Sequence, residues 1–493
     1  MSFRRAAALL CLAAAWATAA PEAPFPHHHR DLNRTTSYEK MAAFLRSAAR
    51  PGLITVSEEG QSTQGRSLFL VRLNRGGAKA TFKVLFYAQQ HGDEVSGKDA
   101  LLYLIRDIAE RPERLPVDVD LYLMPMVNPD GAEANQRCNG AGADLNSDHL
   151  QLVQPETRAL HRAARRIHPH LAVDSHEFTR DGKAALARGW THWEAITMDG
   201  LNHPVFPDEL TAAALAWVES ARPVLDRAGH AYGRYRVGGL PPDEEIRPST
   251  TEVTDGRNSL GALGTLSFII EAGVRRAQPD PQADLGARVD AYLALYRHLL
   301  GTTTSRKQVR ALAERARKAP LPRFLATNFF WANRGGKITT VKMMERSSGR
   351  TTEIPTANFM ADLVVKASVA TPRAYAIDAR AAASFRVVLE AQGIRFEVLD
   401  APRRLVAERC RLLRFEEVED PVYARYENRQ IVARDGAAAR GFPAGTLLVS
   451  LDQPLARLAI VVLEPCMLYG IYADKAFRAL TEADGTLPVW RVP

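Results

Sequence analysis

Apolar residues in the first 300 positions of the chain follow two alternating patterns. Short continuous apolar runs, typical of buried strands, cover residues 82–87, 119–127, 171–173 and 265–270. Apolar residues at helical spacing follow the first run, at Leu101, Leu102, Leu104, Ile105 and Ile108, and recur at residues 207–228. Strands that alternate with helices predict an α/β domain in which helices flank a mixed sheet. We expect this domain to span residues 35–304.

A second region follows a stretch rich in arginine, lysine and alanine that ends in Pro320-Leu321-Pro322. Its pattern predicts a strand at residues 373–378, a helix at 381–392 and another strand at 394–399. We therefore predict a smaller C-terminal domain of α/β or α+β type at residues 323–493. Its histidines and acidic residues form no cluster with metal-ligand spacing, so its role is left open.

The N-terminus has the pattern of a signal peptide. Arg4 and Arg5 precede an apolar run at residues 6–15, and Ala17-Thr18-Ala19 matches a cleavage site. We predict a signal peptide at residues 1–20 and a secreted or periplasmic protein. An uncleaved anchor is the alternative, although the run is shorter than a bilayer span requires. No later segment is long and apolar enough to span a bilayer, so no stable membrane insertion is expected after signal removal.

Composition narrows the class of protein. Of 493 residues, 46% are hydrophobic and 24% charged, which excludes disordered, collagen-like and coiled-coil chains. The net charge of +8 is spread along the chain, so no nucleic-acid partner is predicted. Outside the signal peptide, Cys410 and Cys466 are a candidate disulfide pair, and Cys138 would be left over. The pairing and the oligomeric state stay open.

Candidate chemistry begins with His91 and Glu94, which are three residues apart just after the first predicted strand. Both side chains can reach one cation, but a catalytic zinc ion usually takes three protein ligands. His176 supplies a third near the end of another predicted strand, and Glu271 follows the last one. In open α/β sheets the ligand site lies outside the carboxyl ends of the strands. We therefore expect these residues to meet at one edge of the sheet.

Five motifs in this order make the chain resemble the zinc carboxypeptidases (peptidase family M14) over about residues 35–300. They are His91-Gly92-Asp93-Glu94, Asn128-Pro129-Asp130-Gly131, the segment from Arg137 to Ser147 with Asp144 and Asn146, Asp174-Ser175-His176, and Phe268-Ile269-Ile270-Glu271. Jointly these motifs are highly specific.

The resemblance implies a role for each matching residue. His91, Glu94 and His176 would hold one zinc ion, which activates water. Glu271 would be the general base, and Arg137 would stabilise the developing oxyanion. Asp144 would orient a zinc-bound histidine, and Asn146 would contact the substrate.

Two positions depart from the family pattern. Ser147 stands where the family commonly has an arginine that binds the C-terminal carboxylate of a peptide. No tyrosine lies about twenty residues before Glu271, and Tyr232 and Tyr235 are earlier and expected to be packed aromatics. If the carboxylate is bound at all, Arg257, on the predicted loop before the last strand, is the candidate cation.

The leading hypothesis is therefore an exported zinc metallopeptidase, most simply a carboxypeptidase acting on peptides or cell-wall peptides. A zinc-dependent deacylase or amidase acting on N-acyl amino acids or cell-wall peptides is one alternative, because Ser147 leaves carboxylate binding open. A non-catalytic zinc- or peptide-binding protein is another, although binding alone would need neither Glu271 nor Arg137.

Overall fold

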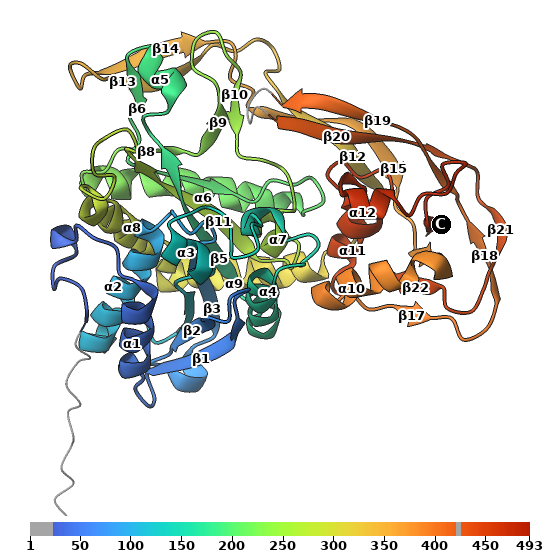
Figure 1. Cartoon of the computed structure of the whole chain (residues 1–493), viewed down its shortest axis with the longest axis horizontal. Helices are drawn as coiled ribbons and strands as arrows, with labels where there is room; N and C mark the ends of the chain where they lie inside the picture. Colours follow the sequence, from blue (N-terminus) through green and yellow to red (C-terminus); the bar gives the residue numbers. More distant parts are fainter. Residues whose placement is uncertain (1–22, 421–424) are drawn as a thin grey trace, which may run out of the picture.

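A computed structural model describes residues 23–420 and 425–493, so the predicted signal peptide at residues 1–20 lies outside the described residues. The first part of the chain is built on one mixed sheet with the strand order β1-β2-β4-β3-β5-β11-β7-β8 (Figure 1). Its strands are β1 (Ile54–Gln61), β2 (Ser67–Leu73), β3 (Phe82–Ala88), β4 (Val119–Met124), β5 (Leu171–Thr179), β7 (Ile196–Gly200), β8 (Tyr232–Arg234) and β11 (Leu266–Val274).

The centre of the sheet is parallel. β3 pairs with β4 and β5, and β5 pairs with β11, in each case in parallel. Side chains of these strands are buried on both faces, which explains why the sequence shows continuous apolar runs there. The outer pairs β1–β2, β2–β4 and β7–β11 are antiparallel, so the predicted mixed α/β sheet is confirmed.

Helices cover both faces of the sheet and enclose two apolar cores. Alternate side chains of β3 point to opposite sides, so that Phe86 belongs to one core and Leu85 to the other. The larger core packs against α1 (Tyr38–Ala48), α2 (Ser96–Glu110), α6 (Asp208–Arg227), α8 (Leu285–Leu300) and α9 (Thr303–Lys318). The smaller core packs against α4 (Pro155–Ile167) and α7 (Gly256–Gly261).

Two details differ from the sequence prediction. The predicted turn at residues 128–131 is the start of helix α3 (Pro129–Ala134), where the Asn128 side chain accepts a hydrogen bond from the Gly131 N–H and Pro129 occupies the first turn. β5 and β11 run beyond their apolar segments. His176 and Glu271 therefore lie within strands, and not after them, because the paired backbones continue to hydrogen-bond through the polar residues.

The C-terminal region is rich in antiparallel strands. One sheet has the order β17-β22-β16-β23, and three ribbons pair β12 with β15, β18 with β21, and β19 with β20. The strands are β12 (Phe324–Ala332), β15 (Asp362–Ala370), β16 (Ala374–Ile377), β17 (Glu397–Val398), β18 (Arg403–Ala407), β19 (Cys410–Asp420), β20 (Arg425–Arg434), β21 (Ala438–Phe442), β22 (Leu447–Ser450) and β23 (Val489–Val492). The helices are α10 (Ala382–Gln392), α11 (Ala456–Leu463) and α12 (Lys475–Arg478).

One hairpin of this region joins the first part of the chain. β13 (Thr339–Glu345) pairs with β14 (Thr351–Thr356) and, on its other side, with β6 (Trp190–His192), which follows α5 (Lys183–Ala187). At the top of Figure 1 this hairpin lies beside the ribbon of β9 (Arg236–Gly238) and β10 (Ile246–Pro248). The division into domains at residues 304 and 323 stays a prediction.

The structure also bears on the cysteines and on membrane insertion. Cys138, Cys410 and Cys466 are free, so the candidate pair of Cys410 and Cys466 is not formed. Within residues 23–420 and 425–493, no helix combines the length and the apolar character that crossing a bilayer requires.

Candidate metal centre and active site

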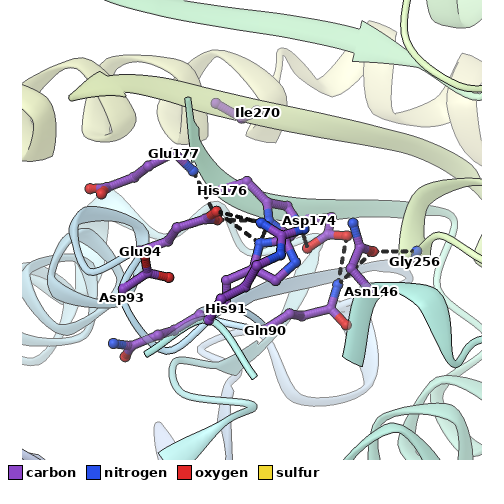
Figure 2. A network of polar contacts seen from close by, with 12 residues as sticks. Gln90, His91, Asp93, Glu94, Asn146, Asp174, His176, Glu177, Gly256 and Ile270 are labelled. Carbon is purple, nitrogen blue, oxygen red and sulfur yellow. Dashed lines mark hydrogen bonds and ion pairs between the residues drawn. The ribbon is translucent and has the colours of Figure 1, made fainter. Parts of the chain in front are cut away.

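Three candidate ligands converge at the carboxyl ends of the central strands. His91 and Glu94 lie on the connection between β3 and α2, and His176 lies on the adjacent strand β5. Glu94 stands between the two imidazoles: its Oε1 is 2.8 Å from His91 Nδ1 and its Oε2 is 2.9 Å from His176 Nδ1 (Figure 2). One ligand atom from each of the three buried residues lies within 4.8 Å of the others.

The outward nitrogen of each imidazole faces a carboxylate. His91 Nε2 is 3.2 Å from Asp144 Oδ1, and His176 Nε2 is 2.9 Å from Asp174 Oδ1. Asp144 is the residue predicted for this position, whereas no role was predicted for Asp174. A signal for it was present, because Asp174 and His176 are two residues apart on β5 and so share one face of the strand.

The electrostatics of this group favour a positive charge at its centre. Burial alone would lower the pKa of His91, but the carboxylates of Glu94 and Asp144 together outweigh burial and raise it. The pKa of His176 is likewise raised against burial, by Asp174 and Glu94. The two imidazoles in turn lower the pKa of Glu94 well below its usual value although burial acts in the opposite direction. A bound cation would be stabilised by the same arrangement.

Glu271 lies beside the candidate ligands because of strand register. It is paired with His176 in the parallel ladder between β11 and β5. Burial raises the pKa of Glu271 to about 7, and the carboxylate of Glu94 acts in the same direction. The carboxyl group therefore titrates near neutral pH, where a general base is most effective.

Tyr235 is a site residue that the sequence interpretation placed elsewhere. It was expected to be a packed aromatic, but it lines the same cavity as Glu271, and its hydroxyl donates a hydrogen bond to the Glu271 carboxylate. It lies between β8 and β9, where the chain returns to the edge of the sheet. Distance along the chain from Glu271 could not reveal this return.

Arg137 and Asn146 border the candidate metal ligands. Arg137 Nε donates a hydrogen bond of 2.9 Å to Asp144 Oδ2, and its Nη1 lies 3.6 Å from Glu94 Oε1. About half of its side chain, 53%, is exposed, so the guanidinium also faces the open cavity. Asn146 lies on a 3-10 turn (Leu145–Ser147), and its Oδ1 accepts a hydrogen bond of 3.0 Å from the Gly256 N–H.

Arg257 lies in the wall of the cavity but is already paired. It lies on α7, a short helix where a loop was predicted, because Asp255 caps that helix by accepting a hydrogen bond from the Asn258 N–H. The Arg257 side chain is fully buried, and its Nη2 is 2.7 Å from Asp255 Oδ2 and 2.6 Å from the Thr250 carbonyl oxygen.

A cavity of about 370 Å³ brings most of the predicted residues together. Its lining includes His91, Glu94, Arg137, Asn146, Arg257 and Glu271, together with Tyr235, Phe178, Ser249 and Thr250. A volume of this size falls within the range of ligand-binding sites in proteins.

Part of the chain is similar in sequence to known carboxypeptidases. Residues 41–185 match the family model described as zinc carboxypeptidase. Carboxypeptidase 2 of Trichophyton rubrum is 30% identical over 250 residues, which cover 48% of this chain and 46% of the relative. Carboxypeptidase D of Mus musculus is 31% identical over 164 residues, which cover 25% of this chain and 12% of the relative.

A solved metallo-carboxypeptidase from Pseudomonas aeruginosa, in complex with (2-guanidinoethylmercapto)succinic acid, is 26% identical, with 54% of this chain and 68% of that chain covered and a TM-score of 0.42. The chain spans about half the length of the fungal relative. The matched residues include the three candidate metal ligands, whereas Tyr235, Arg257 and Glu271 follow them. The resemblance indicated by the motifs is thus confirmed: residues 41–185 match the zinc carboxypeptidase family.

Proposed function

We propose that this chain is an exported zinc-dependent hydrolase of amide or peptide bonds, and most simply a metallocarboxypeptidase. The observation that carries this proposal is the register of β5 and β11, which sets Glu271 beside His176 while His91 and Glu94 complete the ligand group. Cation ligands, a candidate base and an exposed guanidinium then surround one cavity.

The donor set of His91, Glu94 and His176 suits one zinc ion. Two imidazole nitrogens and one carboxylate are ligands that zinc prefers, and three protein ligands leave a position open. Asp144 and Asp174 face the outward nitrogens at 3.2 and 2.9 Å, which restricts the orientation of both rings. A zinc ion in this place supplies a Lewis acid that polarises the scissile carbonyl and lowers the pKa of water.

We assign Glu271 as the general base. Its carboxylate takes the proton from the attacking water and delivers it to the leaving amine as the amide bond breaks. The hydrogen bond from the Tyr235 hydroxyl favours the charged form of this carboxylate and restricts its orientation. Arg137 faces the cavity and is placed to stabilise the oxyanion that forms on the carbonyl oxygen.

Recognition of the substrate terminus is assigned to Asn146 and Arg257. Ser147, exposed at the end of its 3-10 turn, cannot supply a positive charge, so the guanidinium of Arg257 is the candidate partner of a C-terminal carboxylate. Because Asp255 already pairs with Arg257, a substrate carboxylate would have to share this cation.

This assignment predicts a preference between two matched substrates. A peptide with a free C-terminal carboxylate should be cleaved at least about tenfold faster than its C-terminal amide, the scale of one charged hydrogen bond. The variant Arg257→Met/Asp255→Asn removes both charges of the pair together and should lose that preference. Rates on both peptides, measured after circular dichroism has shown that the variant is folded, provide the test.

Two results would revise the assignment. Equal cleavage of acid and amide by the wild type would mean that carboxylate recognition is absent and that the carboxypeptidase label is wrong. An undiminished preference in the double variant would retain the label but exclude Arg257 as the carboxylate-binding residue.

A zinc-dependent deacylase or amidase is the second candidate function. Ser147 and the existing ion pair between Arg257 and Asp255 favour it, because neither position offers an unshared cation to a peptide terminus. Incubation of the zinc-loaded protein with mixed peptides, muropeptides and N-acyl amino acids, followed by mass spectrometry, separates the two. Loss of single C-terminal residues supports the carboxypeptidase, release of acyl groups supports the deacylase, and absence of any product supports a binding protein.

Export and domain organisation complete the proposal. The N-terminal pattern of arginines, apolar run and cleavage site supports a signal peptide at residues 1–20 and a secreted or periplasmic location. We propose residues 35–304 as the catalytic domain, residues 323–493 as a second domain, and a peptide or cell-wall peptide as substrate.

A further inference from the structure

Gln392, in the C-terminal region, contacts a loop that lies next to the candidate active site. This residue ends helix α10, and its side chain is fully buried. Its Nε2 donates hydrogen bonds of 2.8 Å to the carbonyl oxygens of His149 and Leu150, which lie in the loop that follows the Asn146 turn. One amide thus holds two consecutive backbone carbonyls of the N-terminal part.

The side chain of His149 continues from this loop toward the sheet. His149 Nε2 is 2.7 Å from Gln90 Oε1, and its Nδ1 is 2.9 Å from His161 Nε2. All three side chains are fully buried. Burial lowers the pKa of His149 to about 4, so the imidazole is neutral near pH 7.

Hydrogen bonding to neighbouring groups fixes the orientation of the Gln90 amide and the proton position on His149. The Gln90 Nε2 donates a hydrogen bond of 2.8 Å to Asp174 Oδ2. Because a carboxylate accepts hydrogen bonds, the amide nitrogen must face Asp174, and Gln90 Oε1 therefore faces His149. His149 must then carry its proton on Nε2 and accept from His161 at Nδ1. The same Gln90 amide lies 3.2 Å from Asn146 Oδ1 (Figure 2).

This series of contacts ends at a candidate metal ligand. Asp174, held by Gln90 through Oδ2, lies 2.9 Å from His176 Nε2 through Oδ1. A carboxylate that is fixed in this way fixes the ring of the histidine it faces. The contacts therefore run without a gap from α10 to His176 through His149, Gln90 and Asp174.

We propose that Gln392 is a positioning residue for the candidate metal site, and that the C-terminal region thereby completes the support of His176. The inference rests on the proposed function, because it assigns His176 as a zinc ligand. Without the Gln392 amide, two carbonyl oxygens of buried residues lose their donor, and the loop that carries His149 shifts to recover hydrogen bonds. Gln90 and Asp174 then lose part of their restraint.

The test measures zinc affinity in the full chain by competition with a chromogenic chelator. Gln392→Met keeps the length of the side chain but removes the donor, and we expect it to weaken zinc binding by about tenfold, the lower end of effects from residues behind metal ligands. The matched control is Arg457→Met. Arg457 Nε and Nη1 donate to the carbonyl oxygens of Val205 and Ala319, at 3.1 and 3.0 Å, so it fixes the same region away from His149.

The expected result is a tenfold loss for Gln392→Met and unchanged zinc affinity for Arg457→Met. Zinc affinity within twofold of wild type in Gln392→Met would overturn the proposal. An equal loss of zinc affinity in both variants would overturn it too, because a general loosening of the interface would then explain the loss. Thermal unfolding of the metal-free proteins shows separately how far each variant is destabilised.

A second variant decides the matter if Gln392→Met does not fold. His149→Phe preserves a ring but removes the donor to Gln90, and it should weaken zinc binding to the same extent. Where both variants fold, the double variant should lose little more affinity than either alone, because they interrupt one series of contacts. A wild-type protein that binds no zinc would instead refute the proposed function.

Discussion

At the scale of single residues, each candidate zinc ligand is restrained from two directions. His91 contacts Glu94 through Nδ1 and Asp144 through Nε2, and His176 contacts Glu94 and Asp174 in the same way. Rings that are fixed on both nitrogens lose little further freedom when a metal binds. Glu271 lies beside these rings and accepts a hydrogen bond from the Tyr235 hydroxyl, so the candidate base is held separately from the candidate ligands.

Replacing Glu271 should remove turnover and leave the metal site intact. Glu271→Gln preserves size and burial but cannot accept a proton from water, so we expect a loss of at least about a hundredfold in kcat, the scale of a missing general base. Zinc content and thermal unfolding should stay close to wild type. Activity within a few-fold of wild type would exclude Glu271 as the base.

At the scale of elements, the connection from β3 to α2 fits closely against α3. A Cβ built on Gly92 would lie 2.0 Å from the carbonyl carbon of Gly131 and 2.3 Å from the Ala132 nitrogen. Both contacts are with backbone, which cannot move aside as a flexible side chain can. The glycine between His91 and Glu94 therefore permits the approach that places both ligands at the edge of the sheet.

This close contact predicts a large effect for a small substitution. Gly92→Ala should lower the free energy of unfolding by about 2 kcal/mol or more, within the range of overpacking a dense interior, and should weaken zinc binding. Gly436→Ala is the matched control, since nothing lies within 4 Å of a Cβ at this exposed glycine outside helices and strands, and its effect should stay within about 0.5 kcal/mol. Urea unfolding of the two metal-free variants measures their free energies of unfolding. Equal values for the two variants would contradict the packing argument.

The sequence predicted the central elements because their burial is continuous. The runs at residues 82–87 and 207–228 correspond closely to β3 and α6. Apolar pattern failed where the site begins: β5 and β11 continue through Asp174, His176 and Glu271, which are buried but polar. Helix α7 was missed because its six residues are too few to show periodicity.

The candidate site was predictable where short motifs carry it. His91, Glu94 and Asp144 are close together along the chain or follow a recognisable pattern, and the structure brings them together. Tyr235 and Gln392 lie near the site because segments distant along the chain fold back to it. The local sequence around these residues does not indicate that contact. Arg257 was found by its charge, but its pairing with Asp255 required coordinates.

At the scale of the whole molecule, several histidines are buried in the neutral form. Burial lowers the pKa of His149 and His170 to about 4 and that of His203 to about 3, from a usual value of 6.5. His203 lies where the N-terminal part meets β12, with its ring 5.1 Å from the ring of Phe329. The neutral ring of His203 therefore joins the two regions by packing and not by charge.

The lowered pKa values predict that the protein becomes less stable as the pH falls. Below pH 6.5 the unfolded chain binds protons at these histidines while the folded chain does not, so the free energy of unfolding decreases as the pH falls toward 4. His203→Asn keeps an acceptor for the Val205 N–H, which His203 Nδ1 provides at 3.1 Å. Its stability should depend on pH less steeply than the wild type, by about one proton between pH 4 and 6. Urea unfolding across that range gives the slopes, and identical slopes would contradict the assignment.

The central claim is that His91, Glu94 and His176 hold one zinc ion, and metal analysis tests it most directly. Purified wild-type protein, dialysed against metal-free buffer and measured by plasma mass spectrometry, should contain about one zinc ion per chain. His176→Ala should contain a small fraction of that amount, whereas a control in which His27 and His28, both exposed, are replaced by alanine should keep it. A full equivalent of zinc in His176→Ala, or none in the wild type, would contradict the account.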